Sequence, residues 1–98
     1  MILIWLPVAI EERFDQLEYI ALENPLAAIE LDEEIERQTD LLTTQPKMGR
    51  PGRERGTREL VISRTPFIAV YRIAGRRIEI LRFLHGAQQW PSKEGNEA

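Results

Sequence analysis

The sequence contains no cysteine and only one histidine, His85. The absence of cysteine excludes disulfides and thiolate metal sites, and it is typical of proteins kept in a reducing compartment. One histidine is too few for a histidine-based metal site, so we expect neither a metal nor a cofactor. No apolar run approaches the roughly 18 residues of a membrane span, and the apolar residues 1–6 lack the basic flank of a signal peptide. We therefore expect a cytoplasmic protein that does not bind a membrane.

Basic residues are scarce in the first half of the chain and concentrated in the second. Residues 1–46 carry two basic and eleven acidic residues, whereas residues 47–93 carry eleven basic and three acidic residues. The net charge of −3 therefore conceals two regions of opposite sign. Such asymmetry predicts one surface that attracts polyanions and one that repels them. Alternatively, the two halves neutralise each other across a shared interface, and both arrangements can coexist because so many unbalanced positive charges cannot all be buried.

The first half predicts a strand followed by two helices. The chain of 98 residues fits one domain, which we place at residues 1–91, followed by a polar tail at residues 92–98. A short strand is expected at residues 2–5. The first helix begins at Pro7 and ends at Asn24, because a residue before proline avoids the α region. The second begins at Pro25 and ends before Pro46. With almost no loop between them, the helices must fold back as an αα-hairpin.

The second half predicts a loop followed by three strands. Residues 47–58 hold three glycines, one proline and five basic residues, which is typical of a loop. Strands are expected at residues 57–64, 67–73 and 78–85, with a turn at residues 74–77 in which Gly75 adopts a positive φ. The predicted fold is an α+β two-layer sandwich in the order β-α-α-β-β-β, with the helical hairpin packed on an antiparallel sheet.

One apolar stripe of the hairpin is expected to face the sheet. Its predicted helical positions are Ile10, Phe14, Leu17, Leu31 and Ile35, and its partners on the strands are Leu60, Ile62, Val70 and either Ile80 or Leu81. The last strand has apolar residues at both odd and even positions, which face opposite sides of a strand. This is expected of a central strand covered on both sides or of a strand with a bulge. The alternation therefore leaves open which sheet face carries the arginines.

Four features together resemble the RelE/ParE superfamily of type II toxin–antitoxin toxins. They are the order of the elements and the sequences MGRPGRERGTREL, FIAVYRI and ILRFLHGAQQWP, which end at Leu60, Ile73 and Pro91. The likeness runs from about Asn24 to Pro91. It implies the β-α-α-β-β-β fold and a bacterial toxin that is neutralised by a cognate antitoxin, whose disordered segment folds along it.

The superfamily implies two different activities. RelE-like members cut mRNA in the ribosomal A site, and ParE-like members inhibit DNA gyrase. A nuclease needs a base for the 2′-hydroxyl, cations for the charged phosphorane and an acid for the leaving oxygen. The candidate acid is His85, and the candidate phosphate clamps are Arg58, Arg64 and Arg82. For the base, only Glu59 and Tyr71 are nearby ionisable choices.

Three departures from the nuclease pattern favour the ParE-like activity. Residues 86–89 are Gly, Ala, Gln and Gln where an arginine is expected, and Ile68 stands where the nucleases often have arginine. The isoelectric point near 5.2 is also low for a ribosome-binding protein. We therefore favour a gyrase inhibitor over the alternative, a ribosome-dependent mRNA endoribonuclease. A toxin fold that retains only antitoxin binding is a third hypothesis.

The basic half is also the predicted binding surface for phosphates or for the antitoxin. The residues assigned to this role are Arg50, Arg53, Arg55, Arg58 and Arg72. An acidic antitoxin segment is expected to place carboxylates beside Arg58, Arg64 or Arg82. Since ordering that segment costs free energy, its apolar residues should also be buried over the sheet edge or the helical hairpin.

Overall fold

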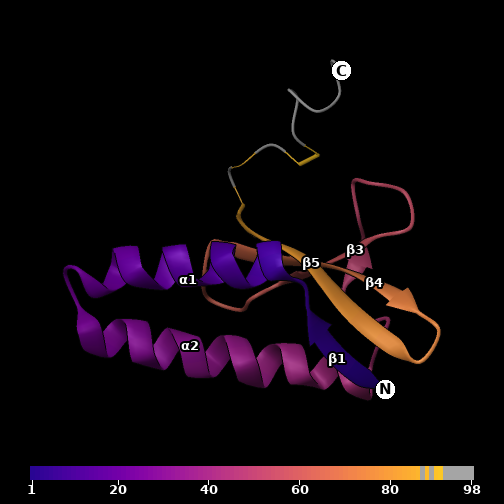
Figure 1. Ribbon diagram of the computed structural model, residues 1–98, viewed down its shortest axis with the longest axis horizontal. Coiled ribbons are helices and arrows are strands. Elements are labelled where there is room, and N and C mark those ends of the chain that lie inside the picture. Colours follow the sequence, from indigo (N-terminus) through magenta and orange to yellow (C-terminus); the bar gives the residue numbers. More distant parts are fainter. Residues whose placement is uncertain (87, 89, 92–98) are drawn as a thin grey trace.

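The computed structural model describes residues 1–86, 88, 90 and 91, and it forms one helical layer packed on one sheet (Figure 1). The predicted polar tail, residues 92–98, lies outside the described residues. In chain order the elements are β1 (Ile2–Trp5), α1 (Pro7–Ala21), α2 (Pro25–Asp40), a 3₁₀ turn η1 (Leu41–Thr43), β2 (Arg50–Pro51), β3 (Arg58–Val61), β4 (Phe67–Ala74) and β5 (Arg77–His85). This order confirms the predicted layout, with β2 as an addition inside the predicted loop.

Proline residues set the start of both helices. Pro7 and Pro25 occupy the first helical turns of α1 and α2, where a missing N–H leaves no hydrogen bond unmade. Asn24 caps α2, because its side-chain oxygen accepts a hydrogen bond from the Ala27 N–H at 3.1 Å. The two helices run back along each other, and the turn between them lies farthest from the sheet (Figure 1).

The sheet is mixed rather than wholly antiparallel, which corrects the prediction. Its strand order is β1-β5-β4-β3-β2, and β1 runs parallel to β5 while the other pairs are antiparallel. The reason lies in the helical hairpin, which returns the chain to the end where it began. The Met1 amino group consequently donates to the Thr43 carbonyl at 3.2 Å. The chain then completes its meander on the far side of β5, so β1 and β5 point the same way.

Strands β4 and β5 are buried on the hairpin side, and the part that contains Ile68, Val70 and Leu84 is covered on the opposite side as well. On the hairpin side, the core contains Ala9, Ile35 and Leu42 from the helical half and Leu60, Ile62, Phe67, Ala69, Tyr71, Ile78, Ile80 and Phe83 from the strands. On the opposite side, which we call the second face, Trp90 packs over Ile68, Val70 and Leu84. A bulge also interrupts the β4–β5 register at Val70/Tyr71. Both explanations for the unbroken apolar pattern therefore hold.

The predicted rotation of α1 is wrong. Ile35, Leu60, Ile62 and Ile80 are buried as expected, and Leu17 and Leu31 pack against them. However, Ile10 is 53% exposed and Phe14 is 60% exposed, while Ala9 is completely buried. Because each helical residue turns by about 100°, Ile10 lies about 100° and Phe14 about 140° around the helix from Ala9. Val70 is buried, but within the second face.

We expect the two phenylalanines to differ sharply in their contributions to stability. Phe83 is 1% exposed, so Phe83→Ala should lower the free energy of unfolding by about 3–5 kcal/mol through lost transfer energy and a cavity. Phe14→Ala should cost less than about 1 kcal/mol, because its ring is already largely in water. Urea unfolding followed by circular dichroism measures both variants. A loss at Phe14 as large as that at Phe83 would contradict the observed rotation of α1.

Candidate functional site

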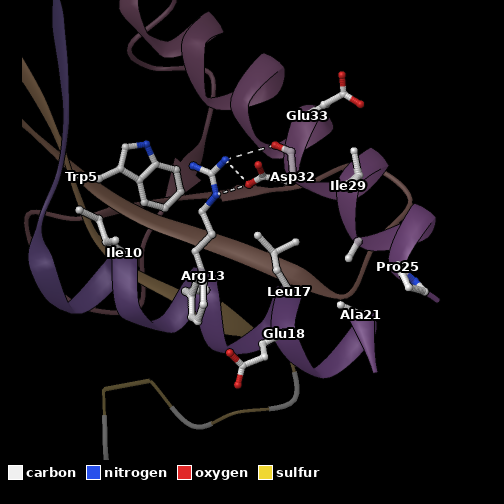
Figure 2. Close-up of a pocket in the computed structure, with 12 residues that line it drawn as sticks. Trp5, Ile10, Arg13, Leu17, Glu18, Ala21, Pro25, Ile29, Asp32 and Glu33 are labelled. Atoms are coloured by element: carbon white, nitrogen blue, oxygen red, sulfur yellow. Dashed lines mark hydrogen bonds and ion pairs between the residues drawn. The ribbon is translucent and has the colours of Figure 1, made fainter. Parts of the chain in front are cut away.

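An open groove of about 770 Å³ runs between α1 and α2, from Trp5 at the sheet end towards the turn of the hairpin (Figure 2). Most of its lining is apolar: Trp5, Ile10, Phe14, Leu17, Ala21, Pro25, Ala28 and Ile29. Its charged residues are Arg13, Glu18, Asp32 and Glu33. The stripe of α1 that was predicted to face the core therefore lines this groove instead. A contiguous exposed apolar surface on a small domain marks a binding site.

Arg13 is held inside the groove by neighbours on three sides. Its guanidinium lies 4.7 Å from the centre of the Trp5 ring, and its Nη2 is 2.6 Å from Asp32 Oδ1 (Figure 2). The same Nη2 is 3.1 Å from Glu36 Oε2. The cation is thus matched by two carboxylates and stacked on an aromatic face. With Glu18 and Glu33 added, the rim of the groove carries a net negative charge.

Glu12 connects α1 to the edge of β5. Strand β1 ends at Trp5, opposite Ile80, so among the described residues no strand pairs with the outer edge of β5 beyond that point. Glu12 Oε1 accepts from the Phe83 N–H at 2.9 Å, and Glu12 Oε2 accepts from Arg82 Nη2 at 2.6 Å. The hydrogen bond from Arg82 to Glu12 and the negative charge of Glu12 outweigh burial and raise the pKa of the Arg82 guanidinium. Glu12 therefore satisfies an edge N–H and fixes Arg82 at the same time.

Glu59 organises the arginine-rich loop at residues 50–58. Its side chain is only 1% exposed, and its carboxylate lies 3.1 Å from both Arg50 Nη2 and Arg53 Nε. It also accepts from the Arg53 backbone N–H at 2.9 Å. Burial raises the pKa of Glu59, but the hydrogen bonds from Arg53 and Arg50 outweigh burial and lower it below its ordinary value. The predicted loop is thus built around a buried, ionised carboxylate.

Tyr71 anchors the preceding segment. Its hydroxyl accepts from the Gly49 N–H at 2.9 Å and donates to the Pro46 carbonyl at 2.7 Å. A Cβ on residue 49 would lie 2.6 Å from the Tyr71 ring, so only glycine fits there. Arg58 completes the arrangement by donating to the carbonyls of Gly49 at 2.9 Å and Lys47 at 3.1 Å. Glu59 and Tyr71, the two candidate bases, are therefore both engaged in structural contacts.

The candidate nuclease residues lie apart. His85 pairs with Phe67 in the β4–β5 ladder, and the two rings meet edge to face at 5.9 Å between centroids, on the hairpin side of the sheet. Arg82 pairs with Val70 on the second face, where its guanidinium lies 5.1 Å from the centre of the Trp90 ring. Arg64 lies in the turn before β4, at a strained φ of 64°, and Arg58 begins β3 at the other end of the sheet.

The second face carries most of the predicted phosphate- or antitoxin-binding arginines. Arg72 and Arg77 share Glu79, with distances of 2.6 Å and 3.1 Å, and the Glu79 side chain is only 8% exposed. Glu59, which holds Arg50 and Arg53, pairs with Val70 and so shares that face. Arg55 is exposed in the loop. The face that carries the arginines, which the sequence left open, is therefore the one opposite the helices.

The groove was missed as a site because its residues were assigned to the core. A signal was present in the sequence, since α1 has more large apolar residues than one buried stripe uses. Val8 and Tyr19 of α1 and the following residue Leu22 are also exposed, in addition to Ile10 and Phe14. Surplus apolar residues on a surface helix indicate a second contact surface.

Comparison with known proteins gives consistent matches. A family model described as "ParE toxin of type II toxin-antitoxin system, parDE" matches residues 3–90. The chain is 44% identical over 80 residues to a Sinorhizobium fredii protein named "Putative toxin Y4kP". The aligned region covers 81% of this chain and 82% of that relative. It also resembles a solved structure titled "Chromosomal ParDE TA system from P. aeruginosa", with a TM-score of 0.79 and 28% identity over 87% of this chain and 95% of that one. Within the described residues, neither helix has the length and apolar character to cross a membrane.

The depressed pKa of Glu59 predicts a pH-dependent contribution to stability. Because the folded pKa is lower than that of the unfolded chain, the stabilisation is complete above the unfolded value of about 4.3 and is lost as the pH falls through the folded value. Glu59→Gln should cost about 1.5–3 kcal/mol at pH 7. The difference from wild type should shrink as the pH falls below about 4.

Urea unfolding between pH 2.5 and 7 measures this dependence. Glu54→Gln is the matched control, because Glu54 is an exposed glutamate in the same loop. A difference between wild type and Glu59→Gln that stays constant at every pH would contradict the assigned role of the carboxylate.

Proposed function

Since this chain belongs to the ParE toxin family, it is the toxin of a type II toxin–antitoxin system, and we propose that it inhibits growth by acting on DNA gyrase in the cytoplasm. The family match confirms the resemblance found in the sequence. The toxin role and the antitoxin partner follow from the family. The target is our proposal, and it rests chiefly on the separation of the residues that an RNase mechanism would need to bring together.

General acid–base cleavage of RNA requires its groups to surround one phosphate. Here β5 directs His85 and Arg82 to opposite faces of the sheet. Arg58 lies at the start of β3, at the other end of the sheet, and donates hydrogen bonds to loop carbonyls. The candidate base Glu59 is held ionised by two arginines, and the Tyr71 hydroxyl is engaged on both sides. This arrangement favours a toxin that acts by binding over one that acts by cleavage.

We further propose that the groove between α1 and α2 receives the antitoxin. Ile10, Phe14 and Ile29 are each more than half exposed there, which gives a folding partner the apolar surface needed to offset its ordering cost. The acidic rim favours a segment with basic residues beside its apolar positions. The segment proposed for the groove therefore differs in charge from the acidic segment expected beside Arg58, Arg64 and Arg82.

Phe14→Asp should weaken antitoxin binding by roughly 30-fold or more, the effect of losing about 2 kcal/mol at a central aromatic contact. Tyr19→Asp is the matched control, because Tyr19 is an aromatic residue of α1 that is 75% exposed and does not line the groove. Isothermal titration calorimetry with the cognate antitoxin measures both affinities. Equal losses for the two variants, or no loss at Phe14, would place the antitoxin elsewhere.

His85→Gln should leave growth inhibition nearly intact, because the imidazole packs against Phe67 and has no assigned part in binding gyrase. Supercoiling by purified gyrase with wild type and variant measures the proposed activity, and cleavage of translated mRNA measures the alternative. If His85 is instead a general acid, its loss should lower cleavage by roughly 10²–10⁴. A variant that folds and binds antitoxin but is harmless would refute the gyrase proposal, provided that wild type releases mRNA fragments with 2′,3′-cyclic phosphate ends.

A further inference from the structure

Two arginine pairs on the second face are each centred on a buried glutamate. Arg50 and Arg53 share Glu59, and Arg72 and Arg77 share Glu79. Each cluster has two positive charges and one negative charge, so each keeps a net positive charge. The four arginine side chains are 41–57% exposed, whereas the two carboxylates are at most 8% exposed. The carboxylates therefore hold the guanidinium groups from beneath and leave part of each in solvent.

The two clusters are neighbours. Glu59 pairs with Val70 on β4, and Arg72, two residues farther along the same face of β4, pairs with Glu79 on β5. With neighbouring strands about 4.8 Å apart and two residues along β4 rising about 7 Å, the Cα atoms of the two glutamates lie about 12 Å apart. Figure 1 shows the loop before β3 and the β4–β5 turn on the side away from the tip of the helical hairpin. Arg55 lies in that loop and Arg76 lies in that turn, and both are exposed.

We propose that the surface formed by these four arginines, which we call the arginine surface, binds the sugar–phosphate backbone of duplex DNA. A guanidinium has five N–H donors in a planar fork, and one or two of them are enough to bind the buried carboxylate. The remaining donors suit phosphate oxygens. Since the buried carboxylates already order these side chains, little rotamer entropy remains to be lost when a phosphate binds.

The surroundings of the arginines favour duplex DNA over other polyanions. A single strand is usually held by aromatic rings that stack on its bases, and the most exposed rings among the described residues, Phe14 and Tyr19, lie on the helical hairpin. An acidic protein segment needs apolar surface to offset its ordering, and this toxin offers that surface chiefly in the groove. A duplex needs only phosphate contacts.

This inference goes beyond gyrase inhibition, and it is tested with the toxin alone. Fluorescence anisotropy with a labelled 20-base-pair duplex should show binding that weakens steeply with salt. Arg77→Gln and Arg53→Gln each leave one arginine on the buried glutamate, so folding should survive. Each should weaken binding roughly three- to tenfold at 50 mM salt and reduce the salt slope by about 0.9.

Arg37→Gln is the matched control, because Arg37 is an exposed, ion-paired arginine on α2, in the helical layer and not on the second face. It should leave DNA affinity unchanged. Absence of duplex binding by wild type, or equal losses for Arg37→Gln and Arg77→Gln, would overturn the proposal. Tighter binding to single-stranded DNA than to the duplex would overturn it in favour of unpaired nucleic acid. A loss of antitoxin affinity in Arg53→Gln and Arg77→Gln would overturn it by assigning the surface to the antitoxin. Gyrase inhibition is measured separately, so the two proposals can fail independently.

Discussion

The contact between Glu12 and the edge of β5 sets the orientation of everything on the hairpin. Where β1 ends, the Glu12 carboxylate takes the place of a strand partner for the Phe83 N–H and binds Arg82 as well. With Glu12 facing the edge and Ala9 buried, α1 has only one rotation about its axis. Phe14 follows Glu12 by two residues, or about 200°, so it must point away from the edge of β5. The groove is a direct consequence.

Much of the fold could be predicted because it depends on local signals. Pro7 and Asn24-Pro25 set the helix starts, and Gly75, with a φ of 63°, forms the β4–β5 turn. The rotation of α1 could not be predicted in the same way. It is decided by a hydrogen bond between residues 71 positions apart in the sequence, and the periodicity of α1 contains two apolar stripes without indicating which one is buried. The strand direction of β1 likewise depends on where the whole hairpin returns the chain.

The functional residues were harder to assign because the sequence shows charges but not their partners. Eleven basic residues in the second half suggested phosphate clamps, yet Arg58 and Arg82 serve mainly to hold a loop and a strand edge. Two buried glutamates determine where four of these arginines lie. Glu59 and Glu79 are only two carboxylates among many cations, but burial lets each of them position two arginines. Neither alternation nor composition reveals such three-residue clusters.

The opposite charges of the two halves remain largely separate in the folded chain, and this separation suits two different partners. In the groove, apolar side chains are exposed and the cation Arg13 is already matched by Asp32 and Glu36, so affinity must come from burying apolar area. On the second face, guanidinium groups are exposed above buried carboxylates, so affinity must come from charge and fall with salt. A partner that covers the groove binds only the folded toxin. It would stabilise the fold by about 4 kcal/mol at a concentration 1,000 times its Kd, in addition to hiding the exposed apolar surface.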